Sequence, residues 1–153
     1  MLRLVLDTNV WLDWLVFADP RIKSLQTMVA AGDAEIVINA DCEAELLRVL
    51  GYPLQKWTLD AGQQTACIER CRTVVHKVEP PCNIVLPQCA DPDDQKFLEL
   101  SAGACAHYLL SRDQALLALA RHRPPLSFHI VTPDEFTARR GVESAGGTMP
   151  RAV

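Results

Sequence analysis

Short apolar runs recur along the chain. The first spans residues 2–6, and further runs cover 36–38, 74–78, 107–110 and 128–131. Short runs of this kind are typical of strands that are buried on both faces of a parallel sheet. The pattern therefore predicts a series of buried strands separated by longer segments.

Apolar residues at helical spacing occupy the segments between these runs. We expect helices over 9–17, 21–31, 39–50, 58–71, 91–106, 115–120 and 133–139. Thr58 is the expected cap of the fourth helix, and Asp91-Pro92 is a strong start for the fifth. Three prolines between residues 80 and 90 predict an irregular loop before that fifth helix.

Strands that alternate with helices predict an α/β fold with three α/β/α layers around a central parallel sheet, of Rossmann-like type. A chain of 153 residues, 49% hydrophobic and 22% charged, suits one globular domain, which we expect over 1–140. Residues 141–153 are small and polar, so we expect a disordered C-terminal tail there. The carboxyl ends of the strands should line the binding crevice.

The length of the apolar runs and the character of the first residues indicate the cellular location of the protein. No apolar run reaches the length of a membrane span. The first residues lack the charged start, long apolar run and cleavage site of a signal peptide, and Asp7 interrupts their apolar stretch. We therefore expect a cytoplasmic protein that does not insert into a membrane.

The chain is acidic, with a net charge of −4 and a pI of about 5.5. This balance argues against a protein that coats nucleic acid through a basic surface. A nuclease remains compatible with it, because divalent cations held by carboxylates would reverse the local charge.

The six cysteines do not form a recognisable metal or disulfide pattern, since no CxxC pair occurs. A zinc site that combines Cys67, Cys71 and His76 with the two following cysteines is conceivable, but the paired spacing of zinc modules is missing. The simpler interpretation is that Cys67, Cys71 and Cys105 are small buried apolar residues.

Four acids stand where the predicted fold would bring chemistry together. Asp7 ends the first strand and Asp113 closely follows the fourth, so parallel strands would place both at one edge of the sheet. Asp94 heads the core-facing stripe of its helix, and Glu45 lies among leucines in the third helix. Carboxylates do not occupy such positions without a partner.

A divalent cation would provide that partner, because clustered carboxylates repel one another and Mg²⁺ prefers oxygen ligands. The hypothesis that follows is metal-assisted phosphodiester hydrolysis. In it, Asp7 anchors the metal, Asp94 and Asp113 complete the site, and Glu45 orients a water.

Each acid also has a plainer interpretation. Asp7 and Asp113 could cap helices, Asp94 could serve a helix dipole, and Glu45 could be a solvated helix residue. The predicted metal site would be wrong only if all four acids had these plainer roles. Capping explains Asp91 equally well, so it is only a supporting candidate.

Other polar residues lie beside the acids in the sequence. Asn9 and Ser111 each neighbour a site aspartate and could orient a carboxylate. Arg112, Lys96 and Arg48 are the nearest basic residues and are weak candidates for holding RNA phosphates, with surface solvation as the alternative.

These motifs resemble the PIN-domain (PilT N-terminus) family over residues 1–137. LVLDTNVWL resembles the family's first strand with its metal-binding aspartate, and EAELLRVLGYP resembles the helix that carries the family's glutamate. ADPDDQKFLELSAGACAHYLLSRDQALL resembles the region of the third and fourth acids. The last segment looks most like toxin components of bacterial toxin–antitoxin pairs.

The resemblance implies a PIN-like fold and a catalytic and metal-binding set of Asp7, Glu45, Asp94 and Asp113. It also implies cleavage of single-stranded RNA that depends on Mg²⁺ or Mn²⁺ and leaves a 5′-phosphate and a 3′-hydroxyl. An antitoxin protein and a homodimer are further expectations. Trp11, Trp14 and Trp57 are compatible with a dimer interface, although core packing explains them equally well.

Two competing functions stay open at this point. An aspartate-based phosphohydrolase of the haloacid-dehalogenase type also has an aspartate at a strand end, but its second aspartate would stand where this chain has Asn9. A non-catalytic interaction module could keep the fold and some of its acids. The complete set of four acids argues against that module.

Overall fold

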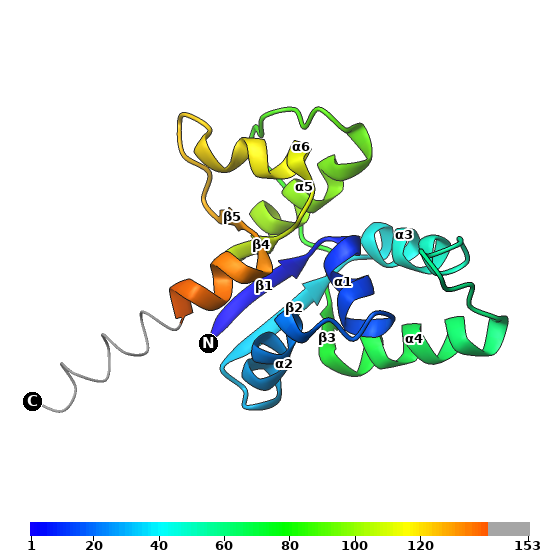
Figure 1. Cartoon of the computed structure of the whole chain (residues 1–153). Helices are drawn as coiled ribbons and strands as arrows, with labels where there is room; N and C mark the ends of the chain where they lie inside the picture. Colours follow the sequence, from blue (N-terminus) through cyan, green and yellow to red (C-terminus); the bar gives the residue numbers. More distant parts are fainter. Residues whose placement is uncertain (141–153) are drawn as a thin grey trace, which may run out of the picture.

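The computed structural model describes residues 1–140, and within them five parallel strands form a central sheet (Figure 1). The strands are β1 (Leu2–Leu6), β2 (Ala34–Ile38), β3 (Val75–Lys77), β4 (Tyr108–Leu110) and β5 (His129–Val131). Their order in space is β3-β2-β1-β4-β5, so the chain builds outward from β1 in both directions. The predicted tail over 141–153 lies outside the described residues.

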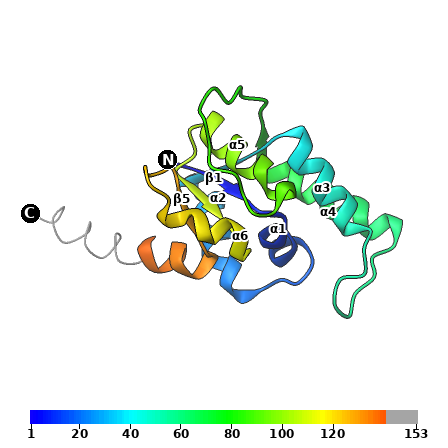
Figure 2. The same cartoon turned by 90° about the horizontal axis from the view of Figure 1, so that it is seen from above.

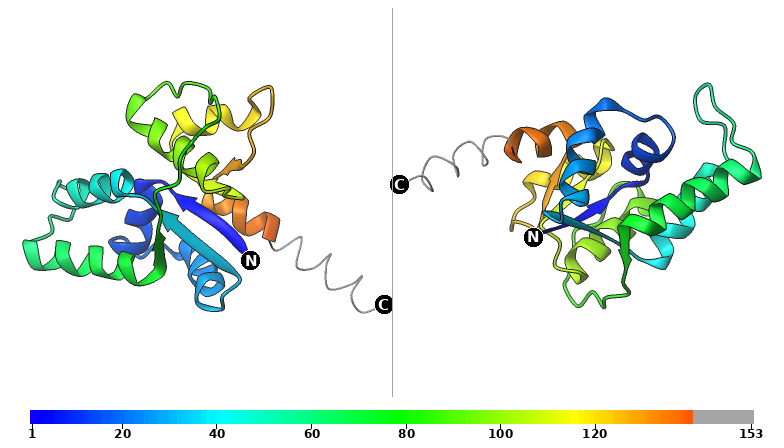
Figure 3. Two further views of the ribbon diagram at one scale, coloured as in Figure 1. Left: turned by 180° about the vertical axis from the view of Figure 1, so that it is seen from behind. Right: turned by 90° about the horizontal axis from the view of Figure 1, so that it is seen from below.

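Helices cover both faces of this sheet. They are α1 (Thr8–Leu15), α2 (Lys23–Ala30), α3 (Ala40–Leu50), α4 (Ala61–Val74), α5 (Gln95–Gly103), α6 (Gln114–Leu117) and a last helix over 133–140, with 3-10 helices η1 (Pro20–Ile22), η2 (Pro92–Asp94) and η3 (Ala118–Arg121). α2 packs on β2, while α5 packs on β1 and β4 from the opposite side (Figures 2 and 3). The arrangement confirms the expected three-layer α/β/α fold.

Burial explains the strand pattern in the sequence. Leu4, Ile36 and Leu109 are fully shielded from solvent at the centre of the sheet. Because helices lie on both sides of these strands, inward and outward side chains are equally apolar. The short apolar runs therefore predicted the strands correctly, although β2 begins at Ala34, two residues before its predicted start.

Helices α3 and α4 lie side by side and extend away from the sheet (Figure 1). α4 begins at Ala61 with a capping box in which Asp60 and Gln63 bond each other's backbone N–H groups. The prediction that Thr58 caps this helix was wrong, because the Asp60 carboxylate and the Gln63 side chain together satisfy two backbone donors.

The helix expected over 91–106 is shorter than predicted. It begins with η2, continues as α5, and ends at Gly103. Cys105 follows in a left-handed backbone conformation with φ of 55°. Its side chain is exposed, so the expectation of a buried Cys105 was wrong, whereas Cys67 and Cys71 are buried as expected.

The tryptophans divide between the core and the surface. Trp11 and Trp14 are buried, with ring centroids 5.5 Å apart. Trp57, in the connection between α3 and α4, is 54% exposed. Core packing therefore accounts for two of the three. Across residues 1–140, no helix combines the length and apolar character needed to cross a membrane.

Candidate metal centre

The carboxyl ends of β1 and β4 bring Asp7 beside Ser111. The backbone N–H of Asp7 donates to the carbonyl of Leu110 at 2.9 Å, so the ladder between the two strands extends to the aspartate. The Ser111 hydroxyl donates to Oδ2 of Asp7 at 2.7 Å and accepts from the backbone N–H of Asp113 at 2.9 Å. Ser111, which is fully buried, therefore links the two aspartates.

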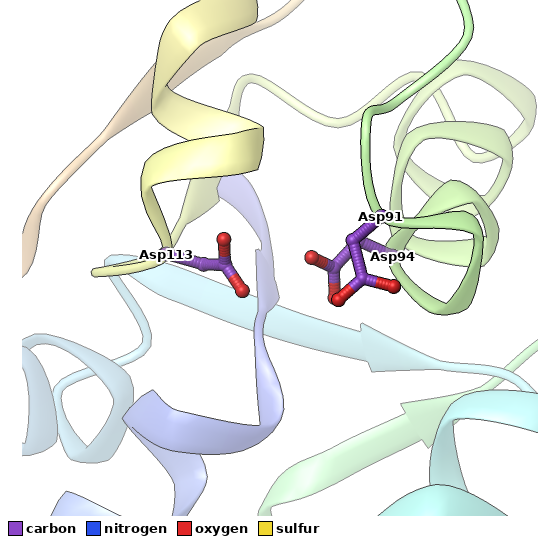
Figure 4. Close-up of side chains that lie close together, drawn as sticks. All are labelled: Asp91, Asp94 and Asp113. Atoms are coloured by element: carbon purple, nitrogen blue, oxygen red, sulfur yellow. The ribbon is translucent and has the colours of Figure 1, made fainter.

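Asp91, Asp94 and Asp113 converge on one point in space (Figure 4). One carboxylate oxygen from each residue lies within 4.8 Å of those of the other two. Asp91 precedes η2 and Asp94 ends it, while Asp113 precedes α6 and faces them. The spacing suits oxygens that surround a single cation.

Capping accounts for two of these acids but not for the buried ones. Oδ1 of Asp113 accepts from the backbone N–H of Ala115, and Oδ1 of Asp91 accepts from that of Asp93. Asp7 stands at the N-cap of α1 and Asp94 at the N-cap of α5, yet neither side chain makes a capping hydrogen bond. Capping hydrogen bonds therefore do not explain the burial of Asp7 or Asp94.

Burial and like charges make the two buried aspartates hard to ionise. Asp7 is 3% exposed, and burial raises its pKa from 3.8 to about 6, although the Ser111 hydrogen bond opposes the shift. Burial also raises the pKa of Asp94, and the neighbouring Asp7 and Asp113 carboxylates raise it further. Ionising both Asp7 and Asp94 therefore costs free energy unless a cation binds beside them.

Within residues 1–140, one carboxylate oxygen of Asp94 lacks the hydrogen-bond partner that a buried oxygen needs. Oδ2 of Asp94 is buried and has no hydrogen-bond partner among the described residues. An orphaned carboxylate oxygen inside a protein is costly, whereas a divalent cation would satisfy it directly. The donor set consists of carboxylates, which is the chemistry that Mg²⁺ and Mn²⁺ prefer. The residues present therefore fit such an ion.

Glu45 lies outside the group of three converging aspartates. From α3, its Oε1 contacts the ammonium of Lys96 at 2.8 Å, and its Oε2 accepts a hydrogen bond from the Thr8 hydroxyl. Its charge is still close enough to contribute to the raised pKa of Asp7. The structure thus brings Asp91, Asp94 and Asp113 together, links Asp7 to Asp113 through Ser111, and leaves Glu45 at their border.

The predicted phosphate-binding residues are mostly engaged elsewhere. Arg112 donates to Oδ1 of the buried Asp13 at 2.8 Å. Lys96 contacts Glu45. Arg48, the third candidate, is exposed on α3 and forms no ion pair among the described residues. Asn9 is exposed in the first turn of α1, beside buried Thr8.

Sequence reasoning overlooked Thr8 and Asp13. Thr8 holds Glu45, and Asp13 holds Arg112, across sequence separations of 37 and 99 residues. The position of Thr8 directly after the strand-end aspartate was a usable signal, since that turn faces the crevice. Asp13 offered none, because a lone acid in an apolar helix does not reveal its partner.

Comparison with known proteins agrees with this arrangement. No curated protein sequence matches the chain. The fold is similar to a chain in the crystal structure of VapBC2 from Rickettsia felis bound to a DNA fragment from their promoter, with a TM-score of 0.58 and 11% identity. The similarity covers 84% of this chain and 97% of that one.

The sequence itself gives a stronger assignment than this distant structural likeness. The family profile described as the PIN domain matches residues 3–115, which include the first strand and all the acids discussed above. That span is well over half of the chain, and the five-stranded parallel sheet is consistent with it. The chain therefore belongs to the PIN-domain family.

Proposed function

We propose that this protein is a metal-dependent endoribonuclease that cleaves single-stranded RNA. The observation that carries the proposal is the buried, unpartnered Oδ2 of Asp94 within a cluster of carboxylates. A role in holding a divalent cation accounts both for that oxygen and for the crowding of acids around it. Membership of the PIN-domain family supports the same chemistry.

Asp94 and Asp113 would hold Mg²⁺ or Mn²⁺ together with Asp7, which Ser111 links to Asp113, and with Asp91 at the exposed side of the cluster. When bound, the ion would polarise the phosphodiester and lower the pKa of the attacking water. Ser111 keeps Asp7 and Asp113 in place through its two hydrogen bonds.

Hydrolysis needs no protein nucleophile in this scheme. Water adds to phosphorus, the bond from phosphorus to the 3′ oxygen breaks, and the leaving oxygen takes up a proton. The products are a 5′-phosphate and a 3′-hydroxyl. Glu45, at the border of the cluster, would orient the attacking water.

We further propose that the protein acts in the cytoplasm as the toxin of a toxin–antitoxin pair. The likeness of its last acidic segment to toxin components supports this, together with the similarity of its fold to a chain of the VapBC2 structure. An antitoxin protein would then block the site. A homodimer is a further proposal, for which exposed Trp57 offers a contact residue.

The experiment is cleavage of a labelled single-stranded RNA in Mn²⁺ or Mg²⁺, with and without EDTA. Wild type is compared with Asp7→Asn and with Asp93→Asn, which neutralises an exposed acid of the same region. Several kcal/mol of transition-state stabilisation correspond to a loss of at least about 100-fold for Asp7→Asn. Asp93→Asn should cut normally.

Equal cutting by wild type and Asp7→Asn would contradict the assigned site. Growth arrest on expression tests the toxin role, and we expect it from wild type and not from Asp7→Asn. If both arrest growth equally, a non-catalytic interaction module becomes the better account. A phosphate trapped on Asp7 would instead identify a phosphohydrolase.

A further inference from the structure

Lys96 contacts Glu45 at the border of the carboxylate cluster. It stands in the first turn of α5, two residues after Asp94. Its ammonium contacts Oε1 of Glu45 at 2.8 Å and also donates to the backbone carbonyl of Asp93. The two side chains are only 19% and 13% exposed, so solvent screens their attraction weakly.

Glu45 is held from two directions at once. Lys96 binds one of its oxygens from the turn that carries Asp94, and Thr8 binds the other from the residue that follows Asp7. The carboxylate is therefore tied to both chain segments that supply buried aspartates. Its orientation depends on these two contacts, because α3 alone leaves a glutamate side chain free to rotate.

We propose that Lys96 is a positioning residue that holds Glu45 at the border of the metal site. The inference rests on the proposed function and deepens it. Without the ammonium, the mostly buried Glu45 would lose its cationic partner among the described residues, and Thr8 alone would hold its side chain. With it, both carboxylate oxygens of Glu45 are held at the border of the cluster.

The geometry distinguishes this role from phosphate binding. The ammonium already makes two hydrogen-bonding contacts inside the protein, and its Nζ lies over the Phe97 ring, 5.2 Å from the ring centroid. An ammonium has three N–H donors, so these contacts leave Lys96 a single donor for any other group. The two contacts that Lys96 makes inside the protein therefore favour a role through Glu45 over a role in holding the RNA backbone.

The test compares Lys96→Met with Lys96→Arg, and with Lys23→Met as an exposed matched control on α2. Thermal unfolding is followed across a Mn²⁺ titration, without RNA. Residues that orient metal-site groups typically change metal affinity or activity by about 10- to 100-fold when removed, and we expect Lys96→Met to need that much more Mn²⁺. Lys96→Arg should restore most of the affinity, and Lys23→Met should match wild type.

Kinetics on RNA provide a second readout. Lys96→Met should lower kcat with little change in KM, and it should add nothing further in a Glu45→Gln background, because the lysine acts through that glutamate. A raised KM with an unchanged kcat would overturn the proposal in favour of phosphate binding. Full additivity with Glu45→Gln would also overturn it.

Two controls keep the outcomes separate. If circular dichroism shows that Lys96→Met is unfolded, Lys96→Gln carries the same comparisons, because it removes the charge and keeps a donor. A wild-type protein with no Mn²⁺-dependent shift would contradict the proposed function itself. A normal wild-type shift that Lys96→Met reproduces would contradict only the role of Lys96.

Discussion

Two regions of this protein bury carboxylates in opposite ways. Glu43, on α3, is 7% exposed, and its Oε1 contacts Arg72 at 3.2 Å and Lys77 at 3.4 Å. Asp94 is equally buried, but its charged neighbours are Asp7 and Asp113. The first carboxylate is surrounded by cations and the second by anions.

The pKa values follow from that difference. Burial by itself raises the pKa of Glu43, but the contacts with Arg72 and Lys77 outweigh it and lower the pKa overall. At the candidate metal centre, burial and like charges act in the same direction, and the pKa of Asp94 rises. An acid that a cation already neutralises supports the fold, whereas acids that crowd together indicate a cation still to be bound.

The largest expected effect is on the pH dependence of the metal-free protein. Asp7 binds its proton more tightly when folded, since its pKa is about 6 instead of 3.8. The folded state therefore holds more protons across this interval, and stability falls as pH rises through it. Between pH 5 and pH 8 the shift corresponds to a loss of about 1.4 kcal/mol for Asp7, and the raised pKa of Asp94 adds to it in the same direction. We expect a loss of about 3 kcal/mol for the two acids together, measured by urea unfolding in EDTA at pH 5 and pH 8.

Glu43 does not disturb this measurement. Because its pKa is lowered, its contribution to stability is lost only as pH falls below the ordinary value of 4.5, outside the interval compared. Adding Mn²⁺ at pH 8 should recover the stability lost by the metal-free protein. Equal stability at the two pH values would remove the contrast between the two regions.

A smaller effect is expected from removing the cation of a buried pair. Asp13 is 4% exposed and is held by Arg112, so Arg112→Met leaves an unpaired buried carboxylate. Because Arg112 is partly exposed, we expect a loss of about 2 kcal/mol, below the value for a fully buried pair. Urea unfolding measures it.

The exposed Arg48 supplies the control for Arg112. Arg48→Met should change stability by less than about 0.5 kcal/mol. The double variant Arg112→Met with Asp13→Asn should recover part of the loss, because no buried charge then remains. If Arg112→Met is as stable as Arg48→Met, the pair with Asp13 contributes nothing.

The smallest effect has the opposite sign. Asp94→Asn removes one of the crowded charges, and we expect the metal-free protein to gain about 1 kcal/mol at pH 8. The stabilisation by Mn²⁺ should be lost in the same variant. Asp93→Asn, at an exposed position one residue away, should leave both quantities unchanged. A destabilised metal-free Asp94→Asn would show that this carboxylate supports the fold.

Local patterns predicted much of the fold and part of the candidate site. The apolar runs predicted the buried strands. The positions of Asp7 and Asp113 after strands predicted that both lie at one edge of the sheet. The rule that parallel strands end at the same edge needs no tertiary information. Element boundaries were less certain, since the Asp60 cap and the end of α5 depend on single turns.

Partners of charged side chains were not predictable in the same way. Lys96 and Arg112 looked like free cations near the acids, yet one contacts Glu45 and the other Asp13. Glu45 was the weakest of the four acids by sequence, because a helical glutamate is usually solvated. Its burial and its two contacts arise from α1 and α5, which lie far from it in the chain.

By itself, the sequence determined the parallel α/β architecture and the presence of a strand-end carboxylate site, because both follow from local periodicity and from the position of acids after strands. Only the tertiary structure decided that Asp91 joins Asp94 and Asp113, that Oδ2 of Asp94 is left without a partner, and that Lys96 serves Glu45. Contacts of this kind depend on distances of a few ångströms between distant segments, and such distances exist only once the helices have packed on the sheet.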